Sequence, residues 1–140
     1  IDANGYITKP AQPFAILHFN HGASGGTDSS TLEKQTSVAY STVSNGMSHT
    51  TGRITVPVDG KYLIYGKNNL LEGGSAHMSV KVNGSNQYGS MAQDADTTEQ
   101  WKSMSIMTIM SLSANDYVES WVYGKQDGAN WNSLIVTLLS

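Results

Sequence analysis

Apolar and polar residues alternate over many short stretches of the chain, and turn-forming dipeptides separate these stretches. A period of two is typical of β-strands, whose successive side chains point to opposite faces. The pattern predicts strands at residues 13–20, 36–43, 52–58, 60–68, 76–83, 87–91, 101–112, 117–124 and 131–139. Asp59-Gly60 and Asn83-Gly84 predict tight hairpin turns, and residues 31–35 could form a single helical turn. Many short strands with almost no helix indicate an all-β sandwich or barrel.

The predicted strands differ in whether one or both of their faces are apolar. The strand at 76–83 alternates cleanly, as in a sheet with one face in water. In contrast, the strands at 60–68, 101–112 and 131–139 carry apolar residues on both faces. A sandwich of this size has one interior layer, so we expect the second apolar face to be buried against other subunits. The expected interface residues are Tyr65, Met107, Ile109, Ile135 and Leu139. The alternative is a closed barrel with loops lying across its outer surface.

Composition narrows the possible classes of protein. The length of 140 residues fits one domain, and charged residues make up 14% of the chain, against roughly 25% in typical globular domains. A net charge of −3 with Arg53 as the single arginine argues against nucleic-acid binding. No apolar run approaches the length of about 18 residues that spans a membrane, so no membrane insertion is expected. The absence of cysteine excludes disulfides and thiolate metal sites.

Residues 51–62, which read TGRITVPVDGKY, resemble a known family signature. This is the Thr-Gly-x-Phe-x-x-Pro-x-x-Gly-x-Tyr-x-Phe motif of the globular head in the C1q and tumour-necrosis-factor superfamily. The matching residues are Thr51, Gly52, Pro57, Gly60 and Tyr62, whereas Ile54 and Ile64 stand in place of the two phenylalanines. Residues 78–85, 112–118 and 133–139 are similar to further strands of that family.

The resemblance implies a ten-stranded jelly-roll β-sandwich at residues 13–140 that assembles as a homotrimer around its inner sheet. Residues 1–12 would then be a connecting segment from a longer, fibre-like protein. Residues 5–14 are similar to the lead-in before C1q-like tips of bacteriophage tail-fibre and other virion proteins. The likeness therefore implies a location on the virion, at a fibre or capsid surface.

Aromatic and amide side chains gather near a turn close to the C-terminus. This mixture suits sugar recognition, because sugar C–H faces stack on aromatic rings while amides hydrogen-bond to the hydroxyls. The candidate ligand-binding residues are Trp121, Tyr123, Gln126, Asp127, Asn130, Trp131 and Asn132, with Tyr88 as a further exposed aromatic. The alternative is that the tryptophan rings pack in the core or in an interface.

Metal binding has weaker support. Asp94, Asp96 and Glu99 fall in a stretch expected to be a polar loop, residues 90–100, and could supply oxygen ligands to calcium. The alternative is a solvated acidic loop. The histidines His18, His21, His49 and His77 are not expected to converge on zinc, although one could meet its own copies on a trimer axis. No metal or other cofactor is assigned.

The expected function is a non-enzymatic trimeric binding head that contacts a host cell-surface receptor or glycan. The alternative is a structural capsid-decoration or fibre-trimerisation domain that binds no receptor. A polysaccharide-degrading enzyme is the least favoured hypothesis, because such an enzyme needs two carboxylates in one cleft. No catalytic residue is assigned.

Overall fold

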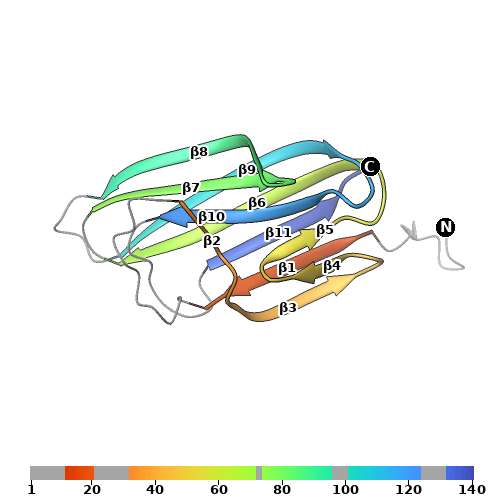
Figure 1. The fold of residues 1–140 in the computed structure, drawn as a ribbon, viewed down its shortest axis with the longest axis horizontal. Coiled ribbons are helices and arrows are strands. Elements are labelled where there is room, and N and C mark those ends of the chain that lie inside the picture. Colours follow the sequence, from red (N-terminus) through yellow and green to blue (C-terminus); the bar gives the residue numbers. More distant parts are fainter. Residues whose placement is uncertain (1–11, 21–31, 72–73, 96–100, 124–131) are drawn as a thin grey trace, which may run out of the picture.

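A computed structural model of the chain describes residues 12–20, 32–71, 74–95, 101–123 and 132–140. Within these residues the chain forms eleven strands and no helix. The strands build two antiparallel sheets that pack face to face (Figure 1). The prediction of an all-β sandwich is therefore confirmed at this level. The described part of the chain contains no helix that is long and apolar enough to cross a membrane.

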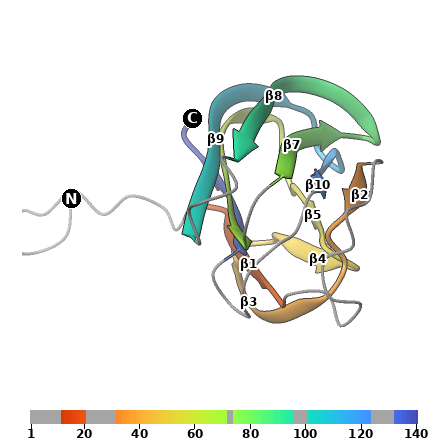
Figure 2. The same cartoon turned by 90° about the vertical axis from the view of Figure 1, so that its left-hand side faces the viewer.

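The two layers are called sheet A and sheet B, and Figure 2 views them along the long axis of the molecule. The strand order in sheet A is β3 (Val38–Ser44), β1 (Phe14–Phe19), β11 (Asn132–Leu138), β6 (Gly60–Leu71) and β9 (Trp101–Leu112). The order in sheet B is β4 (Ser48–Thr50), β5 (Arg53–Thr55), β10 (Tyr117–Tyr123), β7 (Gly74–Val82) and β8 (Ser85–Ala95). The short β2 (Glu33–Lys34) also pairs with β10. The three strands predicted to be apolar on both faces, β6, β9 and β11, are thus neighbours in sheet A.

Several local predictions are wrong, and tertiary pairing explains each of them. Residues 33 and 34 form β2 rather than a helical turn, because they pair with β10. Residues 90–95, which were expected in a loop, extend β8 because β7 continues to pair with them. Asp59-Gly60 closes no hairpin, since β5 and β6 lie in different sheets. Asn83-Gly84 does join β7 to β8, with φ values of 52° and 77° that suit a type I′ turn.

The core lies between the sheets and is built from the inward positions of both. Tyr62 and Ile64 of β6 and Leu134 of β11 belong to the same buried cluster as Met78 of β7. The Tyr62 hydroxyl donates a hydrogen bond to the carbonyl oxygen of Val58 at 2.8 Å, so this buried ring has a partner for its polar end. Burial of each such side chain contributes about 1.5–3 kcal/mol, which makes this layer the main source of stability.

One part of the interior is polar and links the two sheets. The Ser120 hydroxyl of β10 donates to Oε1 of Gln35 at 2.7 Å, and Nε2 of Gln35 donates to Oδ1 of Asn68 on β6 at 3.2 Å. The backbone N–H of Gln35 also bonds to the carbonyl oxygen of Ser120 at 3.0 Å. Since Gln35 is 7% exposed, its amide connects sheet B to sheet A through the inside of the sandwich.

The two ends of the sandwich differ in their connections. The described chain begins and finishes at one end, where Nε2 of Gln12 donates to the carbonyl oxygen of Leu139 at 3.4 Å. The short turns after β3, β7 and β9 lie at this end as well (Figure 1). Strands β1, β6, β8 and β10 all finish at the opposite end. That end is therefore distant from the point at which the chain enters the domain, and we call it the distal end.

Substitution of Gly52 tests how closely the residue after β2, Gln35, approaches the start of β5. Its φ is 75°, and an added Cβ would lie 1.8 Å from the carbonyl oxygen of Gln35. Gly84 is a matched control, because its φ is 77° while its nearest neighbour, the Tyr117 hydroxyl, lies 3.5 Å from such a Cβ. We expect Gly84→Ala to lower the free energy of unfolding by about 1–2 kcal/mol through its left-handed backbone alone.

Gly52→Ala should cost clearly more than Gly84→Ala, since it adds a backbone clash to the same conformational penalty. Urea unfolding of both variants, at equal protein concentration, measures the difference. Equal losses of stability in the two variants would contradict the close contact between Gly52 and Gln35.

Candidate functional site

The outward face of sheet A carries two rows of side chains that run across the strands and are almost entirely apolar. Direct cross-strand pairs build the rows Ile16–Ile135–Tyr65–Met107 and Phe14–Thr137–Leu63–Ile109. These eight residues, together with Leu139, are called the apolar face of sheet A. All five of the predicted interface residues lie on it.

This apolar face is partly open to solvent. Met107 is 72% exposed, Ile109 60% and Leu139 42%, and within the described part of the chain no element covers them. Polar pairs border the rows on β6 and β9, Lys67 with Ser105 on one side and Lys61 with Ser111 on the other. A compact apolar area with a polar rim is typical of a surface that meets another protein.

The outward face of sheet B has the opposite character, because charged side chains meet there around one carboxylate. Glu119 of β10 has Arg53 of β5 and Lys81 of β7 as its direct cross-strand neighbours. Lys34 of β2 pairs with Trp121, two residues further along β10. Although Glu119 points away from the core, it is only 1% exposed, because the longer side chains around it cover the carboxylate. These residues and Tyr117 form what we call the Glu119 cluster.

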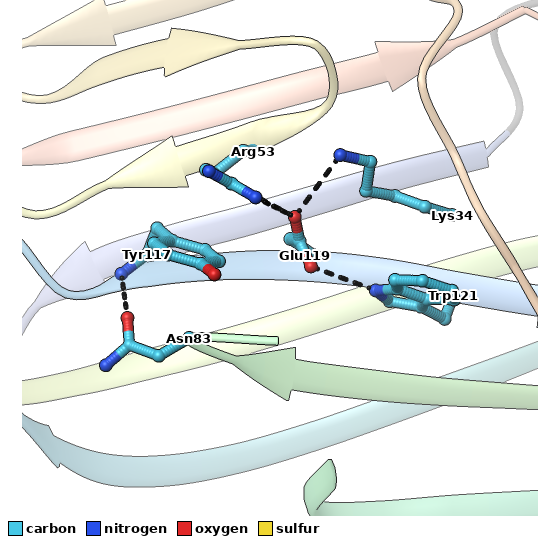
Figure 3. A network of polar contacts seen from close by, with 6 residues as sticks. All are labelled: Lys34, Arg53, Asn83, Tyr117, Glu119 and Trp121. Atoms are coloured by element: carbon cyan, nitrogen blue, oxygen red, sulfur yellow. Dashed lines mark hydrogen bonds and ion pairs between the residues drawn. The ribbon is translucent and has the colours of Figure 1, made fainter. Parts of the chain in front are cut away.

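Both carboxylate oxygens of Glu119 are hydrogen-bonded (Figure 3). Nε and Nη2 of Arg53 donate to Oε1 at 3.0 and 2.9 Å, and Nζ of Lys34 lies 3.4 Å from the same oxygen. The indole N–H of Trp121 donates to Oε2 at 3.1 Å. The carboxylate of Glu119 therefore binds groups from three strands, and its charge is balanced by the cations of β2 and β5.

Aromatic rings hold two of the cations in place. Cζ of Arg53 lies 3.6 Å from the centroid of the Tyr117 ring, and Nζ of Lys81 lies 3.6 Å from that of Trp121. Tyr117 is itself fixed from the neighbouring turn, since its backbone N–H donates to Oδ1 of Asn83 at 3.1 Å (Figure 3). Such cation–π contacts are worth about 0.5–1 kcal/mol at exposed sites, and they orient the cations across the sheet.

Opposing effects act on the pKa of Glu119. Burial of the carboxylate raises the pKa, but hydrogen bonds from Trp121 and Arg53 and the charge and hydrogen bond of Lys34 lower it more, so the pKa lies below its ordinary value. Glu119 is therefore ionised in the folded protein at neutral pH.

The predicted ligand-binding residues are only partly within the described structure. Trp121 lies in the Glu119 cluster, half-buried, with one ring face against Lys81. Tyr123 is the last residue of β10. Asn132, the first residue of β11, is fully buried, and its Oδ1 accepts the backbone N–H of Asn69 at 2.7 Å. Gln126, Asp127, Asn130 and Trp131 lie outside the described residues.

The candidate metal ligands lie partly outside the described residues. Asp94 belongs to β8, whereas Asp96, Glu99 and His21 lie outside the described residues. The ring of His18 stacks on Tyr40 with centroids 4.2 Å apart, and Nε2 of His49 lies 2.8 Å from the Ser41 hydroxyl. Among the described residues, no three His, Asp or Glu side chains are close enough to hold a metal ion.

Sequence reasoning missed the Glu119 cluster as a unit. The alternation of residues in β5, β7 and β10 places Arg53, Lys81 and Glu119 on polar faces, but it does not say which strands are neighbours. Lys34 could not be assigned to a strand from the sequence, because a strand of two residues is too short to give a periodic signal.

Comparison with known proteins adds no assignment. No family model matches the chain, and a search of curated proteins finds no matching relative.

Replacement of Glu119 by Gln should destabilise the protein in a pH-dependent way. The folded-state pKa is lower than the unfolded value near 4.5, so the charge stabilises the fold fully above that pH. This contribution is lost as the pH falls through the folded-state pKa. We expect Glu119→Gln to cost about 2 kcal/mol at pH 7, the usual worth of hydrogen bonds to a charged group, and less in acid.

Urea unfolding of the wild type and the variant at pH 7 and at acidic pH measures this difference. Glu33→Gln is the control, because it neutralises an exposed carboxylate on β2 and should change stability by less than about 0.5 kcal/mol. A penalty for Glu119→Gln that stays constant down to strongly acidic pH would show that the charge is not what stabilises the cluster.

Proposed function

We propose that this chain is a C1q-like jelly-roll domain that assembles as a homotrimer and serves as a non-enzymatic binding head, at the tip of a bacteriophage fibre. The apolar face of sheet A is the observation that carries the proposal. It extends over β1 and over β6, β9 and β11, the three strands whose two-sided apolar pattern predicts a subunit interface.

The path of the chain supports the jelly-roll part of the proposal. Successive strands pass repeatedly from one sheet to the other, as from β5 to β6 and from β9 to β10. The first and last strands, β1 and β11, are neighbours in sheet A. Crossings between the two sheets, with pairing of strands that are distant in the sequence, are typical of a jelly roll.

The exposure of Met107 and Ile109 supports assembly through sheet A. Two apolar rows with polar borders would be excluded from water if three copies met around an axis that faces this sheet. The size of the exposed side chains argues for a permanent contact, because full burial of each contributes about 1.5–3 kcal/mol.

The polarity of the domain supports a role in binding. Because the described chain begins and finishes at one end, the distal end lies on the opposite side of the domain from the start of β1 (Figure 1). β10 finishes and β11 begins at the distal end, so Tyr123 and Asn132 flank the segment that contains Trp131. In this proposal the segment contacts a receptor or glycan on the host surface. Three copies on one tip would add avidity.

Assembly through the apolar face predicts a trimer in solution, at three times the chain mass of 15.0 kDa. Met107→Asp should give a folded monomer, because it would place an unpaired charge in the interface three times. Light scattering after size exclusion measures the mass, and circular dichroism verifies the fold.

Thr50→Asp is the matched control for Met107→Asp. It adds the same charge at an exposed position of β4 in the other sheet and should remain trimeric. A monomeric wild-type chain at micromolar concentration would contradict the proposed assembly.

The binding role predicts that the chain attaches to host cells or to specific glycans on an array. Trp131→Ala should weaken that attachment about tenfold or more, as loss of a central aromatic contact does. Tyr40→Ala removes a 52% exposed aromatic from the edge strand β3 and should bind like the wild type. A trimer that attaches to no cell or glycan would instead favour the alternative role, a structural domain of a fibre or capsid.

A further inference from the structure

The Glu119 cluster contains more positive than negative charge. Lys34, Arg53 and Lys81 surround one carboxylate, and both Lys34 and Arg53 interact with the same oxygen of Glu119. Among the described residues, Lys81 forms no ion pair, and its ammonium group lies over the Trp121 ring instead. The chain as a whole has a net charge of −3, so this excess is a local feature of one surface.

The cations of the cluster retain hydrogen-bonding capacity. Arg53 directs Nε and Nη2 at Glu119, while within the described chain Nη1 donates no hydrogen bond. The side chain of Arg53 is 39% exposed, and its stacking on Tyr117 fixes the plane of the guanidinium. Lys81 has three donors and no carboxylate partner in the described structure. Both groups can therefore take an external anion without breaking the bonds to Glu119.

Uncharged hydroxyl groups flank the cations on the same face. Thr50 of β4 pairs with Arg53, and Thr55 of β5 pairs with Tyr117. A sheet surface that combines aromatic rings, threonine hydroxyls and a few fixed cations is complementary to a sugar that carries acidic groups.

We infer that the outward face of sheet B at the Glu119 cluster binds an anionic saccharide. The acidic group of the sugar pairs with Arg53 and Lys81, and its hydroxyls contact Thr50 and Thr55. This inference deepens the proposed binding role, on which it rests, by naming the class of receptor. A trimer packed through sheet A would carry three such faces on its outside.

A saccharide fits this surface better than a nucleic acid does. Affinity for nucleic acid grows with the number of phosphates neutralised, and three cations gathered around one carboxylate leave an excess of only two charges. An acidic polysaccharide with charges spaced several ångströms apart needs fewer cations and gains from hydroxyl contacts.

The test measures binding of the 140-residue chain to polygalacturonate, dextran sulfate and neutral dextran by affinity electrophoresis. We expect retardation by one or both acidic polymers, weaker at high salt, and none by dextran. Lys81→Gln should reduce the affinity about tenfold, the usual cost of one charged contact. Lys61→Gln, which removes an exposed lysine from sheet A, is the matched control and should have no such effect.

A second variant avoids the loss of any group from the cluster. Thr50→Glu places a carboxylate beside Arg53 and should weaken binding by occupying the guanidinium, while the fold is retained. Retardation by polygalacturonate alone assigns a carboxylated sugar, and retardation by dextran sulfate alone assigns a sulfated one.

Absence of binding to both acidic polymers, or equal effects of Lys81→Gln and Lys61→Gln, would overturn the inference. The proposed binding role would survive that result if the chain still attached to host cells or to neutral glycans through the distal end. Absence of binding in all of these assays would contradict both the inference and the proposed binding role.

Discussion

A two-layer sandwich has a single interior, and this constraint shapes the whole molecule. The inward positions of β6, β9 and β11 fill that interior with residues such as Tyr62 and Ile106. Their outward positions are apolar too, and Met107 and Ile109 remain largely exposed as a result. Nothing in the local preferences of these strands requires apolar residues on the second face. In the proposed assembly, other copies would supply a second layer of burial for that face.

Sheet B differs from sheet A in having a polar outer face, on which neighbouring side chains bind the buried carboxylate of Glu119. The short β2 shows how the two sides of this sheet cooperate, because adjacent residues of a strand point in opposite directions. Lys34 points outward to Glu119, while Gln35 reaches inward to Ser120 and Asn68. Gly52 lets β5 approach this segment, since any side chain there would meet the carbonyl of Gln35. A segment with only two residues of strand is thus fixed from both faces.

The sequence predicts the strands well where periodicity is long, and poorly where pairing decides. The limits of β9 coincide with the predicted strand at 101–112, and the left-handed turn at Asn83-Gly84 follows from its residue types. β2 and β4 are too short for a periodic signal, and Thr51 adopts a positive φ that its residue type does not favour. The Glu119 cluster depends on the order of strands in sheet B, which alternation cannot supply. The apolar face of sheet A could be predicted from the sequence, because the prediction requires only knowing which residues lie on each face of a single strand.

The few charged residues of the chain are distributed unequally between the outer faces of sheet A and sheet B. Of the eight lysine and arginine residues, Lys34, Arg53 and Lys81 gather at the Glu119 cluster. On sheet A, Lys61 and Lys67 stay at the borders of the apolar rows, where their ammonium groups can remain in water. Charge is thus kept away from the surface where burial would be costly and concentrated on the opposite surface. If sheet A is covered by assembly, the cations stay accessible in every subunit, so one sandwich can combine assembly on one face with recognition on the other.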